Sequence, residues 1–136
     1  LIGLGGFDED LGAGGKWPGA EDSDILLRTL LTGEKAYLCK DLCVYHPTEE
    51  EKIAKLSYSD ISRRGFNLGS GKAALLRKTF LNSHLKWWSV KQWIILLLYA
   101  MAGALISLFK CNIKYFVKDI SSFWGRFIVY FKWPAS

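Results

Sequence analysis

The stretch from residue 19 to residue 28 reads Gly19-Ala20-Glu21-Asp22-Ser23-Asp24-Ile25-Leu26-Leu27-Arg28. Its acids stand where carboxylates stabilise the amide-rich start of a helix, and the apolar residues that follow supply a buried face. Gly33 fits the left-handed position that often ends a helix. The pattern therefore predicts a helix over residues 21–32. Glu21 and Asp22 lie at its mouth, where they either stabilise the helix or take part in proton transfer.

Two short runs typical of β-strands follow at residues 36–39 and 42–46, and Pro47 ends the second run. His46 closes that run and is either an ordinary turn residue or a metal ligand. As a ligand it would be joined by carboxylate and phosphate oxygens, a set that suits Mn²⁺ or Mg²⁺ better than zinc.

The remaining polar segments carry weaker signals. The acidic run from Asp8 to Asp10 lies among glycines and indicates a loop that contacts a ligand. Residues 49–60 predict a charged helix, with Ile53, Leu56 and Ile61 turned inward. Residues 63–71 predict a basic, glycine-punctuated loop or helix entry, followed by a basic amphipathic helix over 72–85. The glycines do not form a phosphate loop, because their spacing is G-x5-G-K and Ala73 follows.

The charge of the chain is divided unequally. Residues 1–60 hold 6 Lys/Arg and 12 Asp/Glu, whereas residues 61–136 hold 12 Lys/Arg and one acid. Five of the six tryptophans lie within 87–133. Tryptophan beside lysine and arginine is typical of a membrane interface. A nucleic-acid partner would explain the basic half, but not the 17 uncharged residues from 93 to 109.

Those uncharged residues predict a helix about 25 Å long, a little short of a ~30 Å hydrocarbon core. The sequence therefore leaves open whether 93–109 spans a membrane or lies in it. The final segment, 113–132, places its charges within about 140° of the helix surface and its aromatic residues on the opposite side, at ~100° per residue. It predicts either an interfacial helix, with cations toward lipid headgroups, or an amphipathic helix packed on its own domain.

The chain begins at Leu1, and Met101 is its only methionine. We expect it to be the C-terminal piece of a longer protein. Its three cysteines show no pairing pattern, which favours reduced thiols and a cytosolic location.

Several blocks together resemble the C-terminal portion of a family 2 glycosyltransferase of the GT-A fold. The blocks are Gly5-Gly6-Phe7-Asp8-Glu9, Ala20-Glu21-Asp22-Ser23-Asp24-Ile25, Val44-Tyr45-His46-Pro47, and Arg64-Gly65 followed by Ala73-Ala74-Leu75-Leu76-Arg77-Lys78. The resemblance covers residues 3–80, with a looser likeness over the tail. It implies an α/β fold with three parts: the acceptor side of a GT-A catalytic domain (1–62), a basic connecting helix (63–86) and membrane-associated helices (87–136).

The resemblance also implies the chemistry. Such an enzyme moves a sugar from a nucleotide-sugar donor to an acceptor hydroxyl with inversion. Asp22 would be the catalytic base and Glu21 would orient the acceptor, with Asp8 and Glu9 on the acceptor side. His46 would join a divalent cation near the diphosphate. From its residue type, Trp17 could stack on an acceptor sugar. The nucleotide-binding half and its D-x-D motif are not in this sequence, so this piece alone should be inactive.

We therefore expect part of a membrane-associated glycosyltransferase at the cytoplasmic face, acting in polysaccharide or glycolipid synthesis on a sugar or lipid-linked acceptor, with membrane lipid and no nucleic acid as a partner. The alternative is a non-catalytic membrane anchor or scaffold, in which the acids only stabilise a helix.

Overall fold

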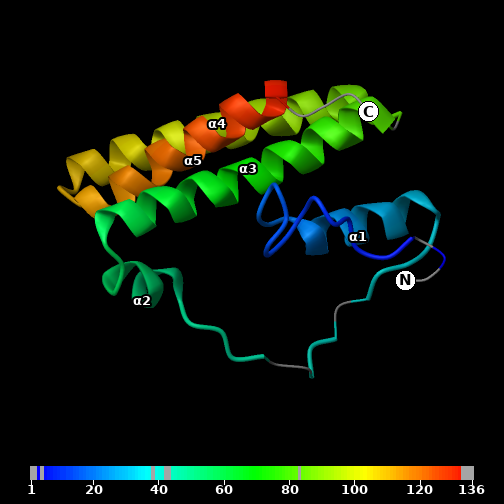
Figure 1. Ribbon diagram of the computed structural model, residues 1–136, viewed down its shortest axis with the longest axis horizontal. Coiled ribbons are helices and arrows are strands. Elements are labelled where there is room, and N and C mark those ends of the chain that lie inside the picture. Colours follow the sequence, from blue (N-terminus) through cyan, green and yellow to red (C-terminus); the bar gives the residue numbers. More distant parts are fainter. Residues whose placement is uncertain (1–2, 4, 38, 42–43, 83, 133–136) are drawn as a thin grey trace.

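Three long helices lie side by side and carry the rest of the chain (Figure 1). The computed structural model describes residues 3, 5–37, 39–41, 44–82 and 84–132. Its helices are α1 (Glu21–Leu31), α2 (Glu49–Ala54), α3 (Tyr58–Asn82), α4 (Lys86–Phe109) and α5 (Ile113–Lys132). α3 and α5 run parallel to each other, and α4 runs antiparallel to both. α1 and its preceding loop lie along the opposite side of α3.

The predicted α/β fold, and with it the GT-A assignment, is wrong. Helices make up 69% of the structure, and the described residues contain no strand and no sheet. Of the residues where strands were expected, 36, 37, 39 and 44–46 have no regular secondary structure and no partner strand. Tyr37, Val44 and Tyr45 are 85–86% exposed there. A strand needs a neighbour to satisfy its backbone, and the other long apolar segments of this chain are helical. Residues 38, 42 and 43, also predicted as strand, lie outside the described residues.

The helix predicted from the opening stretch is confirmed as α1. The chain enters it through two left-handed residues, Gly19 (φ 97°) and Ala20 (φ 72°). Such a φ is uncommon for alanine and costs backbone energy. After the helix, Gly33 has φ 82° and donates its amide to the Leu30 carbonyl, as its position predicted.

α2 is a single short turn of helix held by local and tertiary contacts. Thr48 and Glu51 form a reciprocal capping box at its start. At its end, the ammonium of Lys114 on α5 donates to the Ile53, Ala54 and Leu56 carbonyls. Ile53 and Ile61 are buried as predicted, but the expected helix over 49–60 is divided between α2 and the first turn of α3.

α3 continues unbroken through residues 63–71, which were expected to form a loop or the entry to a helix. The glycines of that segment allow close packing instead. A Cβ on Gly65 or Gly69 would collide with backbone atoms of Lys118 or Ser122 on α5, and one on Gly125 of α5 would collide with backbone atoms of Phe66. α3 and α5 therefore cross backbone to backbone, as helices with small residues at their interface do. This contact outweighs the weak helix preference of glycine. α3 also crosses the boundary expected at residues 62 and 63.

The core between the three long helices combines small residues with stacked rings. Ala73, Ala74, Val129 and Tyr130 are buried there together with Leu11 and Leu76. The Trp93 ring of α4 stacks on the Tyr130 ring of α5, with centroids 4.3 Å apart. The Trp93 indole donates to the Arg126 carbonyl at 3.0 Å, and the Ser89 hydroxyl donates to the Leu76 carbonyl. Trp93 therefore ties α4 to α5, and Ser89 ties the start of α4 to α3.

Candidate functional site

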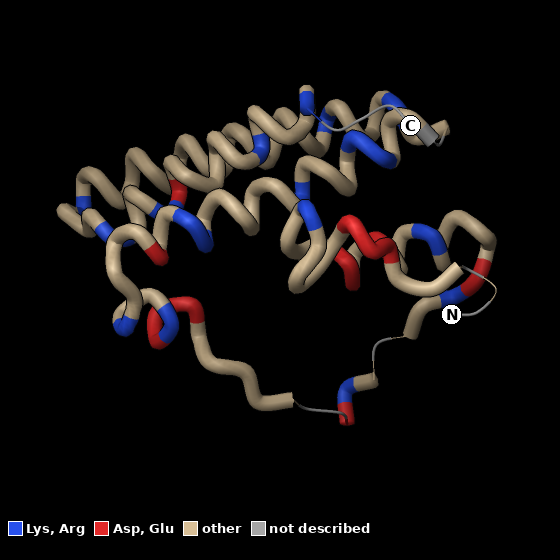
Figure 2. The backbone as a smooth tube through the Cα atoms, in the orientation of Figure 1, with Lys and Arg blue, Asp and Glu red and all other residues tan. Residues whose placement is uncertain are grey.

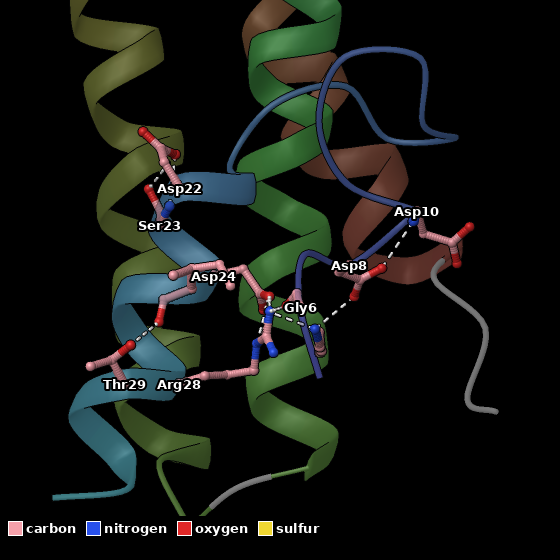
Figure 3. A network of polar contacts seen from close by, with 10 residues as sticks. Gly6, Asp8, Asp10, Asp22, Ser23, Asp24, Arg28 and Thr29 are labelled. Carbon is pink, nitrogen blue, oxygen red and sulfur yellow. Dashed lines mark hydrogen bonds and ion pairs between the residues drawn. The ribbon is translucent and has the colours of Figure 1, made fainter. Parts of the chain in front are cut away.

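Asp22 stands exposed in the first turn of α1. Its carboxylate accepts a hydrogen bond from the Ser23 amide at 2.7 Å and one from the Ser23 hydroxyl at 3.3 Å. In Figure 3 it points away from the ion-pair network deeper in the structure. The first turn has no side-chain cap. A carboxylate in this position is open to solvent and can be reached by a substrate hydroxyl.

Asp24, two residues further on, has a different environment. It is 2% exposed and accepts hydrogen bonds from Arg28 and, at 2.8 Å, from Lys78 of α3. Lys78 also donates to Asp8 at 2.6 Å, and Arg28 reaches the Gly6 carbonyl at 2.7 Å. This network, centred on Asp24 and Lys78 (Figure 3), ties the first loop and α1 to α3. Asp8, which was predicted on the acceptor side, is engaged in this network.

Replacing Lys78 by methionine should lower the free energy of unfolding by about 3 kcal/mol, because it leaves Asp24 buried beside one cation instead of two. Thermal unfolding followed by circular dichroism in mild detergent measures this. The matched control is Arg63→Met. The Arg63 side chain is 74% exposed in its pair with Asp60, and such pairs contribute about 0–1 kcal/mol. Equal effects of the two substitutions would show that the network does not stabilise the fold.

The network also has a pH dependence. Burial alone would raise the pKa of the Asp8 carboxyl, but hydrogen bonds from Lys78 and the Asp10 amide outweigh it and lower that pKa below its usual 3.8. A lowered pKa stabilises the folded state at pH values above 3.8, and this contribution is lost as the pH falls through the folded-state pKa. The Lys78→Met protein should therefore lose less stability than the native protein on acidification below pH 4.

Two clefts lie on either side of the α1 mouth. The larger, about 420 Å³, is lined by the 13–19 loop, Glu21, the end of α2 and the polar side of α3, including Arg63, Arg64 and Asn67. The smaller, about 210 Å³, lies between Ser23, α3 and α4, and Lys72, Trp88 and Gln92 are among its walls. Glu21 and Ser23 each line one of the clefts, and Asp22 lies between these two residues in the sequence. Asp22 itself is not among the residues that line either cleft.

The structure does not bring His46 to Asp22. The His46 ring lies in the extended segment before α2, where Nδ1 lies 3.1 Å from the Pro47 carbonyl oxygen and 3.0 Å from the Lys52 ammonium. That segment runs below the bundle, apart from α1 (Figure 1). Within the described part of the chain, no three His, Cys, Asp or Glu residues gather closely enough to hold a metal ion. The metal assignment of His46 therefore stays a prediction.

The other predicted acceptor residues lie at different depths. The Glu21 side chain packs over Gly12 at the edge of the larger cleft. Trp17 is bridged through its backbone to Leu11 and packs against the core, so its side chain is partly buried. Its contact with an acceptor sugar stays a prediction. Glu9 is exposed in the first loop.

The second feature of functional interest is an apolar surface on α4 and α5. We call it the apolar face, and its members are exposed to between 39% and 64%: Ile94, Leu98, Met101, Leu105, Ile106 and Leu108 of α4, and Ile113, Trp124, Phe127 and Phe131 of α5. α4 is long and apolar enough to cross a membrane, by its length and composition. Figure 2 shows charged residues on α1, α2, α3 and α5, and a long uncharged stretch on α4.

α5 packs on its own domain, as one of its two predictions expected. Its small residues Ser122 and Gly125 are buried, and among its aromatic side chains Trp124, Phe127 and Phe131 are exposed. Its cations, however, are engaged with protein. Lys114 binds the end of α2, and Arg126 donates to the Leu96 carbonyl of α4 at 2.7 Å. The expectation that these cations point to headgroups is not met by these two residues.

Sequence reasoning missed three cations near the site. Lys78 holds Asp24, Arg64 binds Glu49 with both nitrogen–oxygen distances at 3.1 Å, and Lys72 lines the smaller cleft. Their signal was the spacing of cations along residues 63–78. That spacing places the cations toward α1 only if residues 63–78 form one continuous helix, which the sequence did not predict.

Comparison with known proteins gives no relative. No protein-family model, no curated protein and no solved structure matches the chain.

Proposed function

We propose that the chain is the acceptor-side and membrane-binding part of an inverting glycosyltransferase, with Asp22 as the general base. The observation that carries the proposal is the position of Asp22, exposed between two clefts at the mouth of α1, while its neighbour Asp24 is fully engaged in a structural network. A reactive carboxylate must be open to its substrate, whereas a structural carboxylate is held by fixed partners. Asp22 has the first kind of environment and Asp24 the second.

In this proposal the apolar face rests in one leaflet, and α4 does not cross the bilayer. The start of α1, with its three acids, lies beside the same stretch of α3 that the first half of α4 packs against. If α4 crossed, Asp119, whose carboxylate lies beside Gly103, and Arg126, which binds the Leu96 carbonyl, would lie at hydrocarbon depth, which is costly for charged groups. An in-plane orientation buries the apolar face and leaves α1 in water. The exposed, free Cys39 and Cys111 support the cytoplasmic leaflet, where thiols stay reduced.

In the enzyme that joins this chain to a nucleotide-binding half, Asp22→Asn should lower sugar transfer by about 10²–10⁴-fold, the usual contribution of a general base. Donor binding should stay unchanged. Glu34→Gln, at an exposed acid beyond α1, is the control and should leave transfer intact. Radiolabelled sugar transfer to a membrane acceptor fraction measures both variants. Native turnover in the Asp22→Asn enzyme would refute the assignment.

The second candidate is a non-catalytic membrane anchor. It is favoured by the separation of His46 from Asp22 and by the extent of the apolar face. It predicts that Asp22→Asn changes neither transfer nor membrane binding, whereas the glycosyltransferase proposal predicts a loss of transfer with membrane binding retained.

A further inference from the structure

The smaller cleft has both polar and apolar side chains in its wall. Ser23 and Lys72 line it near the mouth of α1, and Gln92 adds an amide from α4. Leu75 and Leu76 of α3, with Trp88 and Leu96 of α4, form the rest of its wall. At about 210 Å³ it has room for a small polar group and the first part of a hydrocarbon chain.

Lys72 is the only basic residue that lines this cleft, and within the described residues it makes no salt bridge or hydrogen bond. Removal of water by the surrounding protein lowers the pKa of its ammonium, the nearby Arg126 lowers it further, and only Asp22 opposes them. Arg126 is itself engaged with the Leu96 carbonyl, so it adds positive potential without neutralising Lys72. An anion in the cleft would complement both cations.

The wall of the cleft on α4 is one edge of that helix. Trp88, Gln92 and Leu96 are four residues apart and therefore share one edge of this helix. Trp88 is 42% exposed, and its neighbour Trp87 is 85% exposed. Trp88 therefore gives the cleft an apolar wall that is partly open to the surroundings of the protein.

We propose that this cleft binds a lipid phosphate, with the phosphate on Lys72 and the first part of the chain against Leu75, Trp88 and Leu96. The inference rests on the proposed function and deepens it, because it names the acceptor as a phosphate-bearing lipid. The reacting hydroxyl of such an acceptor would lie on the Ser23 side of the phosphate, next to Asp22. The apolar chain supplies affinity, and the charged contact sets the position of the head along the cleft.

The test uses the whole chain and a soluble probe, dodecyl phosphate below its micelle concentration, with binding measured by calorimetry. We expect one-to-one binding that weakens about tenfold in Lys72→Gln, the scale of one lost charge-assisted hydrogen bond. Lys72→Arg should recover most of it. Lys91→Gln removes an exposed lysine on α4 outside the cleft and should bind like the native chain.

Two further probes separate the parts of the ligand. Inorganic phosphate lacks the chain and dodecyl maltoside lacks the charge, so both should bind at least tenfold more weakly than dodecyl phosphate. Equal binding of either probe, or unchanged binding in Lys72→Gln, would overturn the proposal. Asp22→Asn should still bind dodecyl phosphate, because the assay needs no transfer. A failure of the base assignment therefore leaves this result standing, and a failure here leaves the base assignment standing.

Discussion

Adding one methyl group to each of Gly69 and Gly125 should lower the free energy of unfolding by about 4 kcal/mol, because overpacking a tight contact costs roughly 1–3 kcal/mol per site. A Cβ on Gly69 would lie 3.0 Å from the Ser122 carbonyl carbon and closer still to its oxygen. One on Gly125 would lie 3.1 Å from the Phe66 carbonyl carbon. Both obstacles are backbone atoms, so they cannot move aside unless α3 and α5 separate.

Gly103→Ala is the matched control for this substitution. Gly103 also lies within a helix, so alanine gains the same intrinsic preference of up to ~1 kcal/mol there. The atom that its Cβ would meet, at 2.8 Å, is a carboxylate oxygen of Asp119, which can rotate away. We therefore expect Gly103→Ala to be neutral or slightly stabilising in thermal unfolding. A double variant at Gly69 and Gly125 as stable as this control would contradict the close α3–α5 crossing.

The second large effect concerns membrane binding. Replacing Leu98 and Leu105 by glutamate should weaken binding to anionic vesicles at least a hundredfold. These side chains are 64% and 52% exposed on the apolar face. Transferring a leucine from water to an apolar phase is worth about 1.5–3 kcal/mol, so losing two exceeds the ~2.7 kcal/mol that a hundredfold change requires. Vesicle sedimentation measures the bound fraction.

The control for the membrane variant places the same two substitutions on α1. Leu26 and Leu30 are 48% and 51% exposed, about as much as the α4 pair, but they lie on the side that the proposal leaves in water. Leu26→Glu with Leu30→Glu should bind vesicles like the native chain. If both pairs weaken binding equally, membrane binding does not depend on the apolar face.

Helices could be predicted from the sequence where the residues of the helix itself carry the signal. α1 follows from its acids, its apolar run and Gly33, and α4 follows from its uncharged length. The segment from 63 to 71 could not, because glycines that break an isolated helix are the same glycines that permit the backbone contact of α3 with α5. That distinction depends on Ser122 and Gly125, more than fifty residues away.

The strand predictions failed for a related reason. Alternating and β-branched residues near Tyr37 and Val44 favour a strand only if another strand lies beside it. Among the described residues none does, so these side chains remain exposed. Of the candidate site, the sequence indicated Glu21 and Asp22 at the helix mouth. The buried role of Asp24 was not predictable, because its partner Lys78 lies 54 positions along the chain.

The depth of α4 in a membrane tests the in-plane account most directly. Ile94, Met101, Leu105 and Leu108 are all exposed and share one side of the helix at ~100° per residue. A nitroxide placed at each position in turn, on a chain whose own cysteines are replaced, reports its depth through collisions with oxygen and a polar nickel complex. We predict the same shallow depth at all four positions. The account is contradicted if the nitroxide is deepest at positions 101 and 105 and shallower at 94 and 108. Positions 94 and 108 would then lie ~21 Å apart across the bilayer.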